Sequence, residues 1–156
     1  PMTDAPSLSD LAEEARRLVF PRFTEDTALA LGLTLVEMAR SGNLAVVIDI
    51  RTADRCLFHA ALPGSAPLND LWAARKSATA LMFQESSLLV GTRNRDKGET
   101  LAKHGLPPEA YADHGGAVPV RVVGVGVVAC VTVSGLPQVE DHRLAVRAIE
   151  ALLAGG

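Results

Sequence analysis

The chain has 156 residues, of which 48% are hydrophobic, 21% are charged and 4% are aromatic, and its formal net charge is −3. This length and apolar content fit one domain over residues 1–156, with residues 1–7 expected to be frayed. The even charge balance and the few aromatic rings argue against nucleic-acid binding. No run reaches the about 20 apolar residues of a membrane helix and no leader pattern is present, so we expect a cytoplasmic protein without nucleic-acid or membrane partners.

Two helices are predicted before the first strand. The first begins at a serine cap, at position 7 or 9, and runs to about Phe20. The second is capped by Thr24 and runs to about Arg40, where Gly42 stops it. This second helix carries two apolar stripes, which is too wide a surface for a helix that packs once against a sheet. We expect its second stripe, Leu29, Leu33 and Val36, to meet another subunit of a homo-oligomer.

The rest of the chain alternates between hairpins and helices. A β-hairpin is predicted over Leu44–Arg51 and Arg55–Leu62, and a helix follows over Pro67–Phe83. Ser86 and Ser87 cap a short helical piece, after which the later elements are a solvated loop over 93–111, strands over 118–123 and 127–133, and a last helix over 137–153. Two hairpins dispersed among helices predict an α+β fold with a mainly antiparallel sheet.

Several familiar chemical motifs are absent or excluded. The run from Gly124 to Ala129 matches the dinucleotide pattern G-x-G-x-x-A, but β-branched residues follow it where a helix would have to start, so it predicts a hairpin turn. The four histidines have no metal-binding spacing, and we predict no metal site. Cys56 and Cys130 lie in strand-like runs, and we expect both to be reduced and buried.

The helix over 67–83 carries the first candidate ligand-binding residues. Asn69 and Lys76 share one stripe with two alanines, and Trp72 lies one turn before Lys76. This arrangement forms a shallow channel with polar walls and a flat apolar side, which suits an anionic or carbonyl-bearing ligand. We expect Lys76 to neutralise the ligand, so that Lys76→Ala weakens binding without unfolding the protein. The alternative is that Trp72 is ordinary core and Lys76 reaches to water.

The last third of the chain supplies the other candidates. His114, Gly115 and Gly116 precede a strand, and Ser134 lies between a strand and a helix N-terminus, where backbone amides favour an anion. Asp141 and His142 lie in the first turn of the last helix, with His142 on its interior face. The alternatives are a solvated loop histidine, a plain helix cap and a hydrogen-bonded core histidine. Ser134, His114, His142 and Asp141 could also be drawn as a hydrolytic triad, although no spacing requires one.

These motifs resemble one family. The combination of N-x-x-W-x-x-R-K at 69–76, S-S at 86–87, H-G-G-x-x-P at 114–119, G-x-G at 124–126, V-S-G-L at 133–136 and E-D-H at 140–142 resembles the haem-degrading-domain family (GlcG/HbpS-like), in its branch of uncharacterised proteins. The resemblance spans about Phe20 to Leu153. It implies a profilin-like three-layer α/β/α arrangement with an antiparallel sheet of about five strands, and large homo-oligomers.

Three functions remain open at this point. The first is an oligomeric protein that binds a small anionic or carboxylate-bearing molecule; the resemblance adds haem as one such ligand. For haem, His114 and His142 are the axial-ligand candidates, and the covalent attachment motif is missing. The second is an interaction scaffold without a metabolite site. The third is a hydrolase or isomerase that uses His142 and Asp141, although we favour binding over catalysis.

Overall fold

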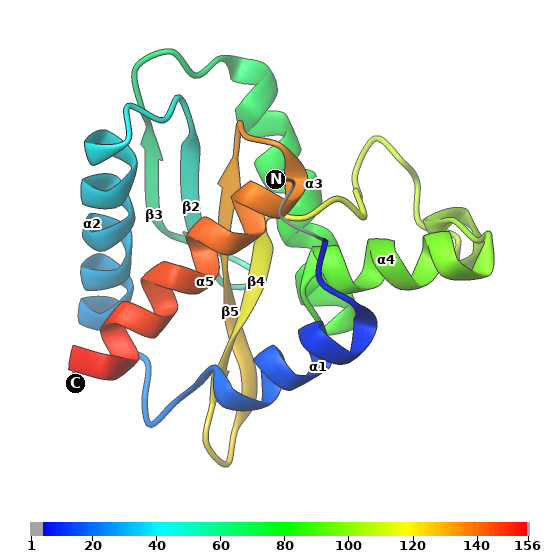
Figure 1. The fold of residues 1–156 in the computed structure, drawn as a ribbon, viewed down its shortest axis with the longest axis horizontal. Coiled ribbons are helices and arrows are strands. Elements are labelled where there is room, and N and C mark those ends of the chain that lie inside the picture. Colours follow the sequence, from blue (N-terminus) through cyan, green and yellow to red (C-terminus); the bar gives the residue numbers. More distant parts are fainter. Residues whose placement is uncertain (1–4, 156) are drawn as a thin grey trace.

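The computed structural model describes residues 5–155 and folds them around a five-stranded sheet with the order β1-β4-β5-β2-β3 (Figure 1). The antiparallel strands are β2 with β3, β2 with β5, and β4 with β5, whereas β1 pairs in parallel with β4. The strand bounds are β1 Val19–Phe20, β2 Val47–Arg51, β3 Cys56–Ala61, β4 Ala117–Val122 and β5 Gly126–Ser134. The predicted α+β class and the sheet of about five strands are confirmed, and the sheet is mixed rather than purely antiparallel.

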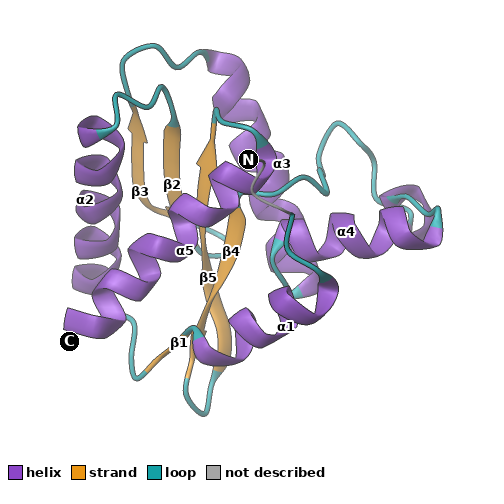
Figure 2. Cartoon of the chain, in the orientation of Figure 1, coloured by secondary structure: helices purple, strands orange, loops and turns teal. Residues whose placement is uncertain are grey.

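Helices cover both faces of this sheet (Figure 2). On one face α2 and α5 pack on the sheet and on each other, and on the other face α3 crosses β2, β4 and β5. Shorter helices α1 and α4 pack together beside these layers. The helix bounds are α1 Leu8–Arg17, α2 Glu25–Ser41, α3 Pro67–Phe83, α4 Ser87–Lys97 and α5 Gln138–Gly155, and a 3-10 helix covers Leu101–His104.

The main core lies between the sheet and the pair α2 and α5. Fully buried Leu31 and Leu35 of α2 meet Ile48 of β2, Val131 of β5 and Ile149 of α5 there. These residues follow the period of 2 in the strands and of about 3.6 in the helices, which is why the elements could be predicted from the sequence. Among the described residues, no helix combines the length and the apolar character needed to cross a membrane.

The opposite face of the sheet is more polar, and it carries the candidate sites. In β5, Thr132 and Ser134 point toward α3, and Thr132 pairs across the sheet with Asp49 of β2. All three residues are buried. The hydroxyl groups of Thr132 and Ser77 of α3 lie 2.7 Å apart in a hydrogen bond. Buried polar groups need such partners, so this layer is specified by hydrogen bonds as well as by packing.

The structure corrects three predictions about local structure. The first helix ends at Arg17 rather than near Phe20, because Phe20 pairs with Val122 of the distant strand β4. The predicted loop from Arg93 begins inside α4, where Arg93 binds Glu85 through two hydrogen bonds of 2.7 and 3.1 Å. Residues 1–4 lie outside the described residues, so the predicted fraying is not tested there.

The two cysteines differ in burial, which is the third correction. Cys130 of β5 is fully buried as predicted, and this burial raises the pKa of its thiol to about 12. Cys56 is exposed, because it begins the edge strand β3 and a β-bulge follows it. The glycine-rich run at 124–126 is the predicted turn between β4 and β5, and Gly124 and Gly126 both have positive φ angles there.

Candidate functional site

One pocket of about 260 Å³ gathers most of the predicted site residues. It lies where the first half of α3, the loop before β4, the end of β5 and the start of α5 meet. Seven of the nine predicted residues line it: Asn69, Trp72, Lys76, His114, Gly115, Ser134 and Asp141. Leu68, Gly135, Leu136 and Gln138 complete the lining. Segments that are far apart in the sequence therefore converge on this pocket.

A buried ion pair forms one side of the pocket. Lys76 is 3% exposed and Asp141 is 2% exposed, and the Lys76 Nζ atom lies 3.0 Å from Asp141 Oδ2. The same ammonium group donates to the carbonyl oxygens of Gly115 at 3.0 Å and Val133 at 2.9 Å. An ammonium group has three N–H donors, so all three are used inside the protein. Lys76 thus ties α3 to the loop before β4, to β5 and to α5.

Asp141 is equally committed to internal partners. Its Oδ1 atom accepts the Leu136 N–H at 2.9 Å, and its Oδ2 atom accepts the Gly135 N–H at 3.3 Å in addition to Lys76. Burial raises the pKa of the Asp141 carboxyl, which the Lys76 charge and the two amides oppose. Burial likewise lowers the pKa of Lys76, which Asp141 opposes. Asp141 therefore occupies the anion position that the sequence predicts near Ser134.

The predicted glycines allow this close packing. A Cβ atom at Gly116 would overlap the Val133 carbonyl oxygen and would lie 2.5 Å from Lys76 Nζ. The φ angle of Gly116 is +142°, a conformation that favours glycine. Gly116 therefore packs against the ion pair and is not among the pocket-lining residues, whereas the N–H of Gly115 donates to Gln138 Oε1 at 2.9 Å.

Aromatic side chains form the second wall. The rings of Trp72 and His114 meet edge to face with their centroids 5.2 Å apart, and the guanidinium carbon of Arg75 lies 4.4 Å from the centroid of Trp72. The His114 side chain is 49% exposed, and partial burial lowers the pKa of its ring, while the nearby Asp113 carboxylate opposes this change. At neutral pH the pocket consequently presents a neutral imidazole.

Comparison with known proteins decides the family. The family model described as "Haem degrading protein HbpS-like" matches residues 23–150. The chain belongs to the HbpS-like family. A UPF0303 protein of Streptomyces coelicolor is 57% identical to this HbpS-like chain over 150 residues, which are 96% of this chain and 95% of that protein. A UPF0303 protein of Burkholderia thailandensis is 48% identical over 153 residues, which are 97% and 93% of the two chains.

Solved structures agree with this assignment. The crystal structure of the Ybr137w protein matches the HbpS-like chain with a TM-score of 0.87 and 33% identity, over 98% of this chain and 90% of that one. The crystal structure of HbpS has a TM-score of 0.68 at 24% identity, over 85% and 90% of the two chains. A complex of PduOC with haem has a TM-score of 0.69 at 20% identity, over 85% and 95%. The last two likenesses show the fold of the family.

His142 lies apart from the pocket of the HbpS-like chain. It is 1% exposed, as the interior position predicts, and its Nε2 atom lies 2.6 Å from Glu14 Oε1 of α1. Its Nδ1 atom is buried and has no hydrogen-bond partner among the described residues. Asp141 and His142 are neighbours in the sequence but bind different elements, so no Ser–His–Asp relay connects them within residues 5–155.

Gln138 is the polar side chain of the pocket that the sequence did not predict. It lies in the first turn of α5, directly after Pro137, and its Oε1 atom holds the Gly115 N–H. The sequence feature that could have indicated Gln138 is a carboxamide side chain directly after the proline that starts a helix, close to the E-D-H motif. Helix-start residues are usually interpreted as caps, so its contact with the loop before β4 was visible only in three dimensions.

Proposed function

We propose that this HbpS-like protein binds a small carboxylate-bearing molecule, with a planar apolar part, in the pocket beside Lys76 and Asp141. Trp72, Leu68 and Leu136 supply apolar lining, and three polar side chains supply hydrogen-bond donors. A mostly apolar cleft with a few placed polar groups is the usual form of a small-molecule site. We base this proposal on the polar groups of the pocket that have no hydrogen-bond partner among the described residues.

The two side-chain amides that line the pocket present free donors rather than free acceptors. Asn69 and Gln138 each commit the carboxamide oxygen to a backbone N–H: Asn69 Oδ1 accepts from Ala66 at 2.9 Å, and Gln138 Oε1 accepts from Gly115 at 2.9 Å. These bonds fix the orientation of both amides and leave both NH2 groups without a partner among the described residues. A ligand that fills this pocket must therefore bring acceptors, and a carboxylate brings two oxygens.

The Lys76–Asp141 pair forms a wall of the pocket but offers little net charge to a ligand. Lys76 uses all three of its donors inside the protein, Asp141 accepts three internal hydrogen bonds, and the two charges cancel at close range. Breaking one of these buried bonds would cost more than a new bond to a ligand returns. This geometry opposes the expectation that Lys76 neutralises the ligand directly and that Lys76→Ala leaves the fold intact. The neutral donors of Asn69, Gln138 and His114 take over the recognition in this proposal.

The pocket of one chain is too small to enclose a whole haem. About 260 Å³ lies below the roughly 300–1,000 Å³ of pockets that enclose drug-sized ligands, and a haem is a large ligand. Of the two axial-ligand candidates, His114 lines the pocket and His142 is bonded to Glu14. The pocket suits a single carboxylate, of the kind that a haem propionate also carries.

A hemin titration tests this limit. We expect weak absorbance changes without saturation, and equal changes in the wild-type protein and in the His114→Ala and His142→Ala variants. The reason is that adsorption to apolar surface needs neither ring. A saturable Soret shift at one hemin per chain, lost in His114→Ala alone, would contradict the size argument.

The ligand class is tested by thermal unfolding with paired small molecules. Benzoate and phenylacetate are compared with benzamide and benzyl alcohol, which keep the ring and remove the charge. A ligand at about 100 times its Kd stabilises the folded state by about 2.7 kcal/mol, so the two acids should raise Tm by several degrees in a saturable way. Equal shifts with the neutral compounds, or none with any acid, would remove the carboxylate proposal.

The pH dependence of binding follows from His114. Burial lowers the pKa of its ring, Asp113 opposes that change, and the cations Arg95, Lys76 and Arg75 reinforce it. The ring is neutral above its lowered pKa and positive below it. A bound carboxylate favours the positive form, so benzoate affinity should rise as the pH falls from 7 toward 5. His114→Gln should flatten this profile, and a profile that stays unchanged in this variant would exclude the role of His114.

The exposed leucines of α2 favour the second candidate function, a homo-oligomeric scaffold. Leu29 is 49% exposed and Leu33 is 55% exposed, on the stripe predicted to meet another subunit. We propose that this stripe joins copies of the chain. If assembly were the whole function, no small molecule would change Tm, whereas the pocket proposal requires a ligand-dependent Tm. The two candidates are compatible, since the stripe and the pocket use different residues.

A further inference from the structure

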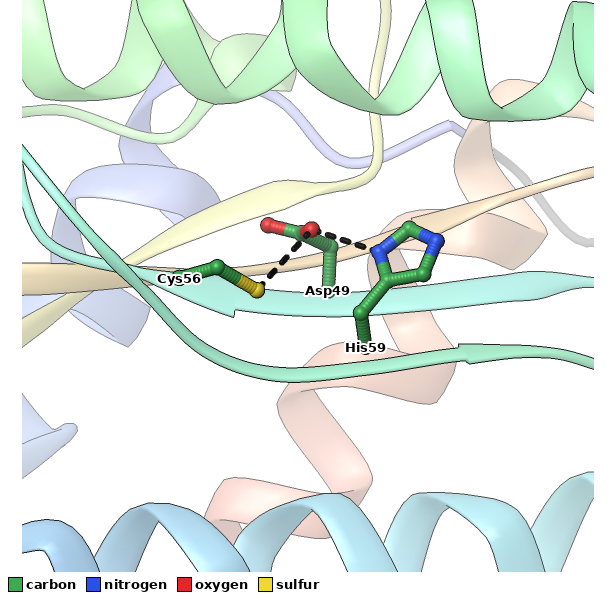
Figure 3. A group of neighbouring side chains, drawn as sticks. All are labelled: Asp49, Cys56 and His59. Carbon is green, nitrogen blue, oxygen red and sulfur yellow. Dashed lines mark hydrogen bonds and ion pairs between the residues drawn. The ribbon is translucent and has the colours of Figure 1, made fainter.

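A second cluster of reactive side chains lies on the β2–β3 hairpin. Asp49 of β2 and Cys56 and His59 of β3 point to the same side of the sheet, toward α3 (Figure 3). One ligand atom from each lies within 4.8 Å of the other two. His59 Nδ1 is 2.8 Å from Asp49 Oδ2, and Cys56 Sγ is 4.0 Å from the same oxygen. None of these residues lines the pocket described above.

A β-bulge creates this arrangement. His59 pairs with Asp49 and Phe58 with Ile50, but the next pair is Cys56 with Arg51, so Leu57 is the extra residue. Side chains alternate between the faces of a regular strand, which would place Cys56 and His59 on opposite faces. The bulge shifts the alternation by one residue and brings the thiol to the face of the imidazole. Bulges often re-aim a side chain in this way at functional sites.

Outer partners hold two of the three side chains in place. The Asp49 carboxylate is fully buried, and Arg51 binds both of its oxygens, at 2.6 and 2.7 Å. The other ring nitrogen of His59, Nε2, lies 2.8 Å from Asp70 Oδ1 of α3. A carboxylate on the far nitrogen of a histidine is the usual outer partner of a metal-binding imidazole.

We propose that Asp49 Oδ2, Cys56 Sγ and His59 Nδ1 bind a zinc-class divalent ion, with a fourth position open to water. Zinc accepts carboxylate, thiolate and imidazole ligands at about 2.0–2.3 Å, which places tetrahedral ligand atoms about 3.3–3.6 Å apart. The oxygen–nitrogen distance of 2.8 Å must open and the oxygen–sulfur distance of 4.0 Å must close, each by about half an ångström. The sulfur and nitrogen atoms, which lie within 4.8 Å of each other, must also move into this range. Cys56 is exposed and lines a hollow of about 370 Å³ beside α3, through which an ion can enter.

The charges of the cluster fit a divalent cation. The Asp49 carboxylate and a Cys56 thiolate carry two negative charges, which the ion balances. Arg51 and Asp70 then balance each other as the outer partners of Asp49 and His59. A site with matched charge leaves no net charge at the fully buried Asp49. The set of one sulfur, one nitrogen and one oxygen favours zinc, cobalt or nickel over the oxygen-seeking magnesium and calcium ions.

Cobalt titration of the reduced, metal-stripped protein tests the site. Co²⁺ bound to a thiolate in a tetrahedral site gives a sulfur-to-metal charge-transfer band and strong visible bands, which zinc should then abolish by displacement. We expect one ion per chain. Cys56→Ser should remove the charge-transfer band, His59→Gln should weaken binding at least tenfold, and Asp70→Asn should weaken it by about 10–100-fold while keeping the spectrum.

The control is Asp54→Asn, which removes an exposed carboxylate from the same hairpin turn and should change nothing. Circular dichroism of each variant verifies the fold. If Cys56→Ser is unstable, the cobalt affinity of His59→Gln still tests the site, because this variant removes a different ligand. Absence of a charge-transfer band in the wild-type protein would overturn the proposal. A cobalt affinity in Cys56→Ser and His59→Gln equal to that of the wild-type protein would also overturn it. The result is independent of the carboxylate pocket, because the two sites share no residue.

Discussion

Replacing Lys76 by methionine should lower the free energy of unfolding by about 3–5 kcal/mol, the range for removing one partner of a buried ion pair. Methionine keeps most of the side-chain volume but leaves the buried Asp141 carboxylate without its positively charged partner. The carbonyl groups of Gly115 and Val133 also lose the N–H donor that binds them. For a chain of this size the loss corresponds to a fall in Tm of about 10 °C. Thermal and urea unfolding measure it directly.

Two further variants isolate the cause. Lys76→Met combined with Asp141→Asn should be less destabilised than Lys76→Met alone, because the second change removes the stranded charge and keeps an oxygen for the Leu136 N–H. Lys103→Met breaks an exposed ion pair with Glu99 and should cost less than about 1 kcal/mol. A Lys76→Met protein with the wild-type Tm would show that the buried pair does not hold the site together.

Gly116→Ala should produce the second large effect, a destabilisation of about 2–4 kcal/mol. An alanine at this position would keep the positive φ angle of Gly116, which costs about 1–3 kcal/mol. Its methyl group would also overlap the Val133 carbonyl oxygen and would lie 2.5 Å from Lys76 Nζ. Displacement of the ammonium group would weaken the ion pair with Asp141. Measurement of the unfolding free energy in urea gives the size of the loss.

Gly124→Ala is the matched control for this change. Gly124 also has a positive φ angle, +74°, but nothing lies within 4 Å of the position of its added Cβ atom. Its cost should stay near about 1–2 kcal/mol, the conformational part alone. Equal losses in the two variants would mean that the contacts with the Val133 carbonyl oxygen and Lys76 Nζ contribute nothing.

The sequence predicts the elements whose signals are local. Thr24 and Gly42 cap the two ends of α2, and Pro67 begins α3. These residues act within one turn of their own position, so no knowledge of the fold is needed. The hairpin turn at Gly124 was likewise predictable, because the β-branched residues after it favour a strand.

Features that depend on distant pairing escaped prediction. The two-residue strand β1 exists only because β4, about 100 residues later, lies beside it. Residues 93–97 have the charge pattern of a loop, but contacts such as the 2.9 Å bond from Asn94 to Asp113 hold them in α4. Secondary-structure preferences are weak where tertiary contacts of this kind decide.

The candidate site shows the same division. Seven of the nine predicted residues line one pocket, because polar residues at the ends of strands and helices converge at one edge of a sheet. Their roles were not predictable, since the internal saturation of Lys76 and the orientation of the Gln138 amide depend on backbone atoms from other segments. The cluster of Asp49, Cys56 and His59 depends on a β-bulge, and no local sequence pattern predicted this bulge.

The most direct test of the carboxylate pocket is a calorimetric titration of benzoate into the wild-type protein and into Gln138→Glu. Glutamate keeps an oxygen for the Gly115 N–H and replaces the free NH2 group by a negative oxygen, so the fold should persist while the ligand is repelled. We expect saturable binding to the wild-type protein and an affinity at least about tenfold lower in the variant, equal to about 1.4 kcal/mol. Equal benzoate affinity in the two proteins would contradict it.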